Sequence, residues 1–469
     1  MKANRKNNLS RRDFLKMAGG VAVSAILVGC AAPAQPTAAP DQTSGETDIK
    51  PTSPPPSTSG ETIELRWWLY NDPGWIKGSE DTIARWKEIN PNVNIKLEHF
   101  PYEELQPTIQ TAMAAKNEAD LIDMFGTWVH SYIKGNTLAE TPAEVMTLAE
   151  ARKLFYAAPL DGYVLNDKLY GMPHEFNLEN GGALVNKAMF EADQLKYPPV
   201  WTKWDEVVAD AQKLVRMDGD TMTRSGFNFL NVDGITFWLW EGILERGANY
   251  FADDGVHLNV TTQEAQDTVQ WMLDLIVKDK VTDPNLYNWT ITEVQDSFFQ
   301  QQSAIGFRGP WVVPGSRLTF PDFKDPWSYE SIPPLFGDKY NFAADSGWGL
   351  TVSPNSPNQK VAWDFVKFVS GTPENARLWN VGSGTVPALK SVAEDPALLK
   401  DMDWLGPSIK ILPFGRFVGD LLDRDMIWYD ISSNTLLAVM QGQMSVKEGL
   451  EKINKESNDT IDAKLKGSE

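Results

Sequence analysis

The spacing of apolar residues changes along the chain, and these changes predict alternating strands and helices. Residues 62–70 (TIELRWWLY) alternate between polar and apolar and then become apolar, as a strand entering a buried sheet does. Residues 79–90 repeat apolar side chains at helical spacing up to a proline, and residues 93–97 alternate again. A second helix over 102–116 and a third strand over 120–125 follow. The start of this pattern predicts a βαβ unit.

Several later helices are predicted by their first residues. Residues 141–144 (TPAE), 261–264 (TTQE) and 356–359 (SPNQ) each place a hydroxyl side chain three positions before Glu or Gln. In such a capping box, the two side chains accept hydrogen bonds from backbone N–H groups that the first turn of a helix leaves free. Strand-like segments and capped helices that alternate in this way predict an α/β protein, with open sheets whose strand ends form crevices.

The first thirty residues have the pattern of an export signal. Basic residues precede an apolar run over 17–28, and Cys30 follows it. Twelve helical residues span about 18 Å, which is shorter than the roughly 30 Å core of a membrane, so the run does not predict a transmembrane helix. Residues 10–16 (SRRDFLK) resemble a twin-arginine export motif and residues 27–30 (LVGC) resemble a bacterial lipobox. We predict a signal peptide over 1–29; an ordinary basic export region and a buried structural thiol are the alternatives.

The lipobox resemblance implies that Cys30 becomes the lipidated N-terminus, which anchors an extracytoplasmic protein to the cell membrane. Residues 31–60 then contain seven prolines and no aromatic residue, so they cannot bury a core. We therefore assign residues 30–60 to the lipidated cysteine and a flexible tether, and expect the folded part to begin near Glu61.

Composition excludes several classes of function. The formal net charge of −20 repels nucleic-acid backbones. A single cysteine cannot form an internal disulfide, and the four histidines lack the spacing of a zinc site, so we expect no metal and no cofactor. The chain has 18 Trp against 12 Tyr, more large flat apolar surface than a core of this size normally needs. Some of these rings are therefore expected to contact a ligand.

The order of segments resembles the family 1 extracellular solute-binding proteins of bacterial ABC importers, of the sugar-binding type. The resemblance covers the chain from about Glu61 to its end. Eight segments carry it, in the order of the family: 85–91 (RWKEINP), 109–122 (IQTAMAAKNEADLI), 169–173 (LYGMP), 185–190 (VNKAMF), 199–206 (PVWTKWDE), 298–311 (FFQQQSAIGFRGPW), 346–352 (SGWGLTV) and 362–368 (AWDFVKF).

This resemblance implies a periplasmic-binding-protein-like fold, with two α/β lobes, a hinge and a ligand cleft between the lobes. It places residues 61–178 and 309–345 in the N-terminal lobe, and residues 179–308 and 346–469 in the C-terminal lobe. It further implies a monomeric receptor that delivers a sugar or oligosaccharide to an ABC transporter permease. The receptor would be no enzyme and would bind no nucleic acid.

Residues at predicted strand ends are candidates for sugar binding. A sugar has apolar ring faces and a rim of hydroxyl groups, which suit aromatic rings flanked by carboxylates and amides. Trp68, Tyr70 and Asp72 follow the first strand, and Thr127 and Trp128 follow the third. Core packing is the alternative for Trp68, because it stands beside a second tryptophan in a strand.

Five further candidates follow from the later segments. Glu175 and Glu179 flank the expected first crossing between lobes, where a solvated loop is the alternative. Trp238 is favoured over the tryptophan two positions later, because the two point about 200° apart on a helix and at most one should face the cleft. Trp311 and Trp348 lie beside glycines at the expected later crossings, where backbone and ligand can approach closely.

Other functions remain open on the sequence alone. A carbohydrate hydrolase also needs aromatic platforms and two carboxylates about 5 to 10 Å apart, a role that Glu175 and Glu179 could fill. A receptor for a solute other than a sugar is a second alternative. A lipid-anchored adhesion module is a third, and it would have neither a hinge nor a small ligand.

Overall fold

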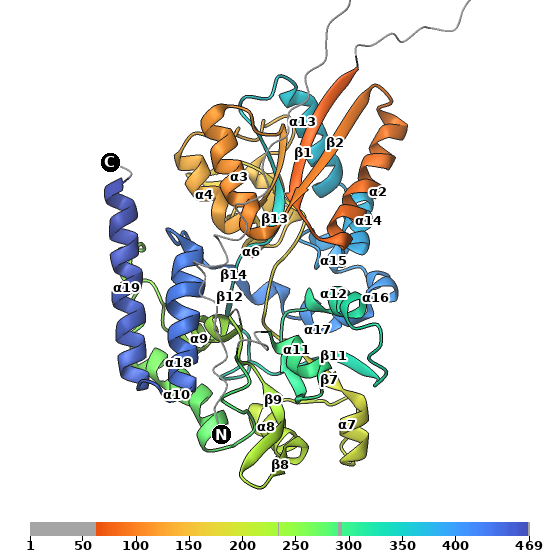
Figure 1. The fold of residues 1–469 in the computed structure, drawn as a ribbon. Helices are drawn as coiled ribbons and strands as arrows, with labels where there is room; N and C mark the ends of the chain where they lie inside the picture. Colours follow the sequence, from red (N-terminus) through yellow and green to blue (C-terminus); the bar gives the residue numbers. More distant parts are fainter. Residues whose placement is uncertain (1–61, 233, 289–292, 468–469) are drawn as a thin grey trace, which may run out of the picture. The chain divides into compact units, whose positions relative to one another are not determined.

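Two separate five-stranded sheets organise the chain, one in each of two lobes (Figure 1). The structure is a computed structural model, and it describes residues 62–232, 234–288 and 293–467. All of these residues belong to one unit of the chain, Gly60–Glu469. The predicted signal peptide, Cys30 and the tether lie outside the described residues.

The first sheet has the strand order β2-β1-β3-β13-β6. Strands β1, β2 and β3 are parallel, whereas β13 runs antiparallel to both β3 and β6. The three predicted strands are all present, and β1 is buried along most of its second half, where its sequence becomes apolar. The strands are β1 (Ile63–Tyr70), β2 (Val93–Phe100), β3 (Leu121–Phe125), β6 (Met172–Pro173) and β13 (Trp348–Val352).

Side-chain caps begin some helices, but the predicted capping boxes differ from the structure: residues 141–144 begin no helix, and the helix that begins at Gln359 has no side-chain cap. The helix after residues 261–264 is capped by Thr262, and a capping box is found instead at Thr147 and Glu150. The Asp72 side chain accepts hydrogen bonds from the N–H groups of Gly74 and Trp75 and so caps α2, whose first residue is a proline. Helices α2 and α14 lie side by side in Figure 1. The helices of this lobe are α2 (Pro73–Ile89), α3 (Tyr102–Ala115), α4 (Gly126–Lys134), α5 (Leu148–Leu154), α6 (Ala157–Asp161), α13 (Gln359–Ser370), α14 (Pro373–Ser383) and α15 (Lys390–Ala393).

The second sheet has the order β11-β7-β10-β9-β8, in which β9 and β10 are parallel and the other pairs are antiparallel. The strands are β7 (Gly182–Asn186), β8 (Arg216–Asp218), β9 (Thr221–Asn228), β10 (Ser303–Phe307) and β11 (Trp327–Ser331). The helices of this lobe are α7 (Lys187–Ala192), α8 (Trp204–Leu214), α9 (Gly234–Glu245), α10 (Gln263–Val277), α11 (Val294–Phe299), α12 (Val312–Thr319), α18 (Asn434–Met440) and α19 (Val446–Gly467), together with the π-helix η3 (Met426–Ser433).

The chain crosses between the lobes three times. The first crossing leads from β6 to β7, the second follows β11, and the third lies between α15 and β14 (Gly415–Phe417), where residues 403–409 already contact β11. The second and third crossings pair with each other as a two-stranded parallel sheet of β12 (Phe342–Ala344) and β14. The remaining elements are β4 (Val164–Leu165), β5 (Lys168–Leu169), α16 (Leu398–Asp401), η1 (Asp403–Leu405), α17 (Gly406–Ile409) and η2 (Leu412–Phe414).

The α/β class with two lobes is confirmed, but the predicted lobe boundaries differ from the structure at two places. The family resemblance places residues 309–345 in the N-terminal lobe, whereas β11 pairs with β7 in the second sheet. It places residues 346–469 in the C-terminal lobe, whereas β13 pairs with β3 in the first sheet and α13 packs on it. The segment around Gly347 does cross between lobes, but it returns to the first lobe instead of leaving it.

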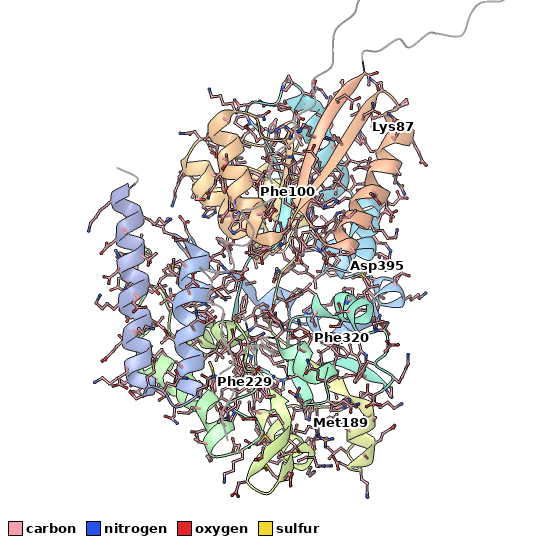
Figure 2. The ribbon with its side chains drawn as sticks, in the orientation of Figure 1. Lys87, Phe100, Met189, Phe229, Phe320 and Asp395 are labelled. Carbon is pink, nitrogen blue, oxygen red and sulfur yellow. The ribbon has the colours of Figure 1, made fainter. Side chains whose placement is uncertain are left out.

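Each lobe has its own hydrophobic core. Side chains from β1, β3, β13, α13 and α14 form the first, and side chains from β7, β9, β10, α9, α10 and α19 form the second. Figure 2 shows Phe229 among the elements of the second lobe and Phe100 at the end of β2 in the first. None of the helices in the described ranges is both long enough and apolar enough to span a membrane.

Candidate ligand-binding cleft

A cavity of about 700 Å³ lies between the lobes. Its walls come from the edge of the first sheet, from the crossing segments and from the edge of the second sheet. Phe320, which follows α12, is one of the lining residues and is labelled in Figure 2. The lining residues are Tyr70, Asp72, Gly74, Trp75, Tyr102, Glu103, Phe125, Glu175, Asn177, Glu179, Val232, Phe237, Glu293, Gln295, Asp296, Arg308, Trp311, Val312, Pro314, Gly315, Ser316, Leu318, Thr319, Phe320, Asp345, Trp348, Ser383, Gly384, Thr385 and Tyr429.

The first lobe contributes an aromatic wall, which we define as Tyr70, Trp75, Tyr102, Phe125 and Trp348. The ring of Tyr70 stacks on Trp348 with centroids 5.7 Å apart, and Trp75 stands perpendicular to Trp348 at 5.2 Å. Strands β1 and β3 end at this edge and the antiparallel β13 begins there, opposite Phe125. The topology of the sheet therefore gathers rings from distant parts of the sequence.

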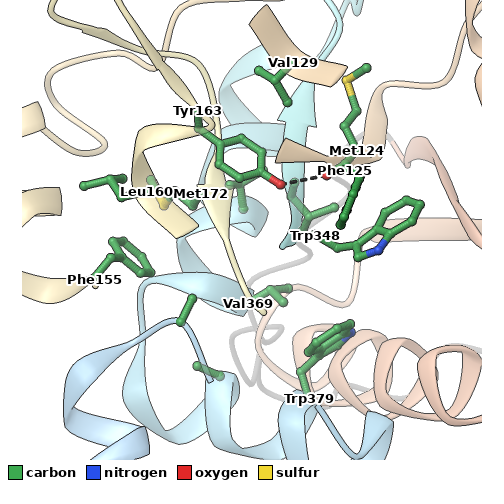
Figure 3. Close-up of a cluster of buried hydrophobic side chains, with 14 of the residues drawn as sticks. Met124, Phe125, Val129, Phe155, Leu160, Tyr163, Met172, Trp348, Val369 and Trp379 are labelled. Carbon is green, nitrogen blue, oxygen red and sulfur yellow. Dashed lines mark hydrogen bonds between the residues drawn. The ribbon is translucent and has the colours of Figure 1, made fainter. Parts of the chain in front are cut away.

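Hydrogen bonds of a buried tyrosine hydroxyl hold the backbone that carries the aromatic wall. The Tyr163 hydroxyl donates to the carbonyls of Met124 and Gly347, at 2.7 Å and 3.0 Å, and the first of these bonds is drawn in Figure 3. Gly347 has φ +131°, and a Cβ there would lie 2.2 Å from the carbonyl oxygen of Glu175. This position in the crossing therefore requires glycine, since any side chain would collide with the neighbouring crossing segment.

Glu175 lies in the first crossing and is 2% exposed. One of its carboxyl oxygens, Oε2, accepts a hydrogen bond of 3.2 Å from the backbone N–H of Trp348. Burial raises the pKa of Glu175 to about 8, and the nearby charges of Asp123 and Asp72 act in the same direction. At neutral pH this side chain is therefore a neutral acid that can donate a hydrogen bond into the cleft.

The second lobe contributes a charged wall, which we define as Glu179, Glu293, Arg308 and Trp311. Glu179 accepts hydrogen bonds from the Gly309 N–H at 2.7 Å and from the Trp311 indole N–H. Arg308 lies 3.3 Å from Glu179 and 2.5 Å from Glu293, and its guanidinium stacks over the Trp311 ring at 4.5 Å. Arg308 and Trp311 follow β10 and Glu179 precedes the antiparallel β7, so these three residues meet at one edge of the second sheet. Glu293 joins them from the N-cap of α11.

A second buried ion pair connects the second crossing to the segment that precedes η3. Asp345 accepts hydrogen bonds from Arg424, at 3.2 Å for the Nε donor, and both residues are less than 4% exposed. The Arg424 guanidinium also lies 4.4 Å from the Trp428 ring and 5.9 Å from Phe125 of the first lobe. This pair therefore links η3, the second crossing and the aromatic wall.

Six of the ten candidate residues line this cavity and four do not. The lining candidates are Tyr70, Asp72, Glu175, Glu179, Trp311 and Trp348; the others are Trp68, Thr127, Trp128 and Trp238.

Three of the four other candidates lie in the first lobe. Trp68 is 4% exposed and donates from its indole N–H to Glu98 at 2.5 Å, so the alternative of core packing holds for it. Thr127 and Trp128 are in the first turn of α4. The Trp128 ring lies 5.3 Å from Trp348, so it supports the aromatic wall from outside the cavity lining.

The expected orientation of Trp238 towards the cleft is wrong. Its ring is fully buried and packs against Phe229 at 4.9 Å and Phe307 at 4.6 Å. Helix α9 is buried on all sides from Gly234 to Leu244, so a choice between two faces of the helix does not arise. We define the inner cluster as Trp204, Phe227, Phe229, Trp238 and Phe307.

Several lining residues were not among the candidates. Trp75 and Tyr102 lie just after the first two strands, so the same strand-end argument could have found them. Arg308 directly precedes the Gly309-Pro310-Trp311 segment and was within reach of the sequence. Asp296 carried no signal, because it lies on a short helix whose position depends on the tertiary fold.

No group of three or more His, Cys, Asp or Glu side chains within the described ranges is arranged to hold a metal ion. The cavity therefore offers aromatic faces, carboxyl groups, amides and one guanidinium as its recognition chemistry.

Comparisons with known proteins agree with this architecture. A curated binding protein of Brucella abortus (strain 2308) is 24% identical over 369 residues, which cover 78% of this chain and 85% of the relative. The galactooligosaccharide-binding protein of Bacillus subtilis (strain 168) is 21% identical over 83% of this chain and 88% of its own. The ABC substrate-binding protein of Listeria monocytogenes, solved in complex with cycloalternan, superposes with a TM-score of 0.69 at 18% identity, covering 86% of this chain and 99% of that one.

The family model of the bacterial extracellular solute-binding proteins matches residues 77–376. That match spans most of the first lobe, the first two crossings and the sheet of the second lobe. The predicted fold is thus confirmed, and the chain belongs to the bacterial extracellular solute-binding protein family.

Proposed function

We propose that this protein is an extracytoplasmic receptor that binds a sugar or oligosaccharide in the cleft and delivers it to an ABC transporter permease. The observation that carries the proposal is the aromatic wall, which meets carboxyl groups from both lobes in one cavity of about 700 Å³. This volume lies within the range of about 300 to 1,000 Å³ that is typical of small-molecule sites. The names of two relatives, which state binding to galactooligosaccharide and to cycloalternan, support it.

The chemistry of the walls suits a sugar. The C–H face of a pyranose ring packs on the flat surfaces of tryptophan and tyrosine, and its hydroxyl groups donate to carboxylates. The ring of Trp311 is only partly buried, and Arg308 and Glu179 fix its orientation. Neutral Glu175 adds a donor, so both acceptors and donors face the cleft.

Closure of the lobes would report binding to the permease. The three crossings are the segments through which one lobe can rotate on the other, and Gly347 lies in the second. The ion pair of Lys134 in the first lobe with Asp420, which follows β14, is one contact that such a motion would change. Ligand contacts to both walls would then favour the closed arrangement.

The remaining parts of the proposal concern the N-terminus and the absence of catalysis. We expect residues 1–29 to be removed and Cys30 to carry the lipid that ties the receptor, a monomer, to the membrane. We expect intact sugar to be released, because the carboxylate of Glu179 is held by three donors and is not free to act as a base or a nucleophile.

The test is a titration of the protein with a panel of mono- and oligosaccharides, in which tryptophan fluorescence reports binding. Each sugar is then analysed by chromatography to show whether it is intact. We expect a saturable change with at least one sugar and recovery of that sugar intact. Cleavage of the sugar would favour the hydrolase instead. A panel that leaves the fluorescence unchanged, together with binding of another solute class, would contradict the sugar receptor.

A further inference from the structure

The charges around the cavity are unbalanced. Among the described residues that line it, seven are acidic and one, Arg308, is basic. Burying carboxylates without a compensating charge costs free energy, because a low-dielectric site disfavours ionised groups. The acidic lining residues are Asp72, Glu103, Glu175, Glu179, Glu293, Asp296 and Asp345.

Three of the seven acidic groups already have basic partners. Glu179 and Glu293 both lie within ion-pair distance of Arg308. Asp345 is paired with Arg424, which lies outside the lining. Each of these three acidic groups therefore has a basic partner without a ligand, although Glu179 and Glu293 share one.

The other four acidic groups have no ion pair with any basic residue in the described ranges. Among the described residues, the donors to Asp72 are the N–H groups at the start of α2, at 2.8 Å and 3.2 Å, and the donor to Glu175 is the N–H of Trp348. Glu103 is exposed at the rim, and the half-buried carboxyl of Asp296 accepts no hydrogen bond from the described part of the chain.

Three of these four groups surround the aromatic wall. Asp72 stands two residues after Tyr70, and Glu103 directly follows Tyr102, whose ring centroid lies 6.2 Å from that of Tyr70. Burial raises the pKa of Tyr70, and the charges of Asp72 and Glu103 act in the same direction. The charge of Asp72 likewise acts on Glu175.

None of the described residues that line this side of the cavity is basic, and Arg424, which lies behind Phe125, is paired with Asp345. The faces of the tryptophan and tyrosine rings and the carboxylates of Asp72 and Glu103 therefore present negative potential, and the neutral carboxyl group of Glu175 adds a carbonyl oxygen that can accept a hydrogen bond.

We propose that the ligand is a sugar that carries a protonated amine, and that its ammonium group binds beside the aromatic wall between Asp72, Glu103 and Glu175. This inference rests on the proposed function and adds the chemical class of the sugar. A neutral sugar could fill the hydrogen bonds but would leave the carboxylates of Asp72 and Glu103 without a compensating charge when the cleft closes. An ammonium group supplies charge, donors and a cation for the aromatic faces at once.

The test uses three β-1,4-linked disaccharides that differ at C2: glucosamine dimer with an ammonium, cellobiose with a hydroxyl, and N-acetylglucosamine dimer with an amide. Calorimetric titration of the full chain at pH 6, where the amine is protonated, should give at least tenfold tighter binding of the glucosamine dimer. That advantage should shrink at 1 M salt, because screening weakens charge interactions. A wider panel of neutral sugars is titrated in parallel.

Each other outcome overturns the inference in a distinguishable way. If cellobiose binds as tightly as the glucosamine dimer or more tightly, the ligand is not an amino sugar, but the protein is still a sugar receptor. The same conclusion follows if a neutral sugar of the panel binds and the glucosamine dimer does not. If a simple diamine such as putrescine binds and no sugar does, the ligand is not a sugar, and the proposed function is contradicted. If none of the sugars tested binds, both the amino-sugar ligand and the sugar receptor are contradicted.

A variant that removes one negative charge tests where the ammonium group of the sugar binds. Asp72→Asn keeps an oxygen that can cap α2, since Asn and Asp are equally good N-caps, but it removes the charge. We expect the ratio of glucosamine-dimer affinity to cellobiose affinity to fall about tenfold. The matched control is Asp322→Asn, which removes the same charge from a fully exposed position outside the cavity lining and should leave the ratio unchanged. A ratio unchanged in Asp72→Asn, with normal thermal unfolding, would contradict the site.

Discussion

The aromatic wall and the inner cluster are both built from tryptophan, tyrosine and phenylalanine, yet only the first opens into a cavity. The inner cluster is enclosed by β9, β10, α8 and α9, and its Trp238 has no exposed surface. The rings of the aromatic wall stand at the strand ends of the first sheet, and Tyr70 and Tyr102 remain partly exposed. The same residue types therefore stabilise a core in one lobe and line a cavity in the other.

What differs is the polar environment of the rings. Beside the aromatic wall lie Asp72, Glu103 and Glu175, which carry charge or donors to the edge of the cavity. In the inner cluster the indole nitrogens of Trp204 and Trp238 are buried and have no hydrogen-bond partner among the described residues. Carboxyl groups beside rings are thus a better guide to a binding surface than the number of tryptophans.

The largest expected change in stability comes from a pair of tryptophan substitutions, one in the inner cluster and one in the cavity lining. Trp238→Ala empties a fully buried site, and we expect it to lower the free energy of unfolding by about 3–5 kcal/mol. Trp311→Ala removes a partly exposed ring and should cost much less stability but at least tenfold in sugar affinity. Urea unfolding and calorimetric titration of both variants check this; a stable Trp238→Ala with weakened sugar binding would reverse the two roles.

The charged wall allows a second prediction. Arg308→Met keeps the length of the side chain but leaves Glu179, 2% exposed, without its basic partner. We expect a loss of about 3 kcal/mol of stability, because removing one member of a buried ion pair strands the other charge. The double variant Arg308→Met with Glu179→Gln should recover part of the loss, as measured by urea unfolding. Equal stability of the single variant and wild type would show that the pair is not needed.

The sequence carries the local part of this architecture well. The alternation in residues 62–70 and the proline after residue 90 predict β1 and α2, strand ends point to Tyr70 and Asp72, and the glycines of an expected crossing point to Trp348. Such patterns are set by neighbours along the chain, so a single sequence contains them.

The parts that could not be predicted depend on contacts between distant residues. Nothing local distinguishes β11, which joins the second sheet, from β13, which joins the first, because strand pairing is decided by the tertiary fold. Helix α9 is apolar on all its faces, so no hydrophobic stripe shows which side is the core. The neighbours of Arg308 in the cleft come from positions 15 and 129 residues away, a separation at which spacing carries no information.

The smallest expected effect is a dependence of the free energy of unfolding on pH, which comes from Glu175 beside the aromatic wall. In the unfolded chain this carboxyl ionises near its ordinary pKa of 4.5, whereas in the folded protein the pKa is about 8. Between these values the folded state holds a proton that the unfolded state has lost, so the group lowers stability as the pH rises through this window.

Glu175→Gln removes this dependence and keeps an oxygen that can accept the Trp348 N–H. Between pH 6 and pH 7 the free energy of unfolding of the variant, relative to wild type, should therefore rise by about 1 kcal/mol. Urea unfolding at both pH values measures the difference, and a constant difference would mean that Glu175 is already ionised in the folded protein.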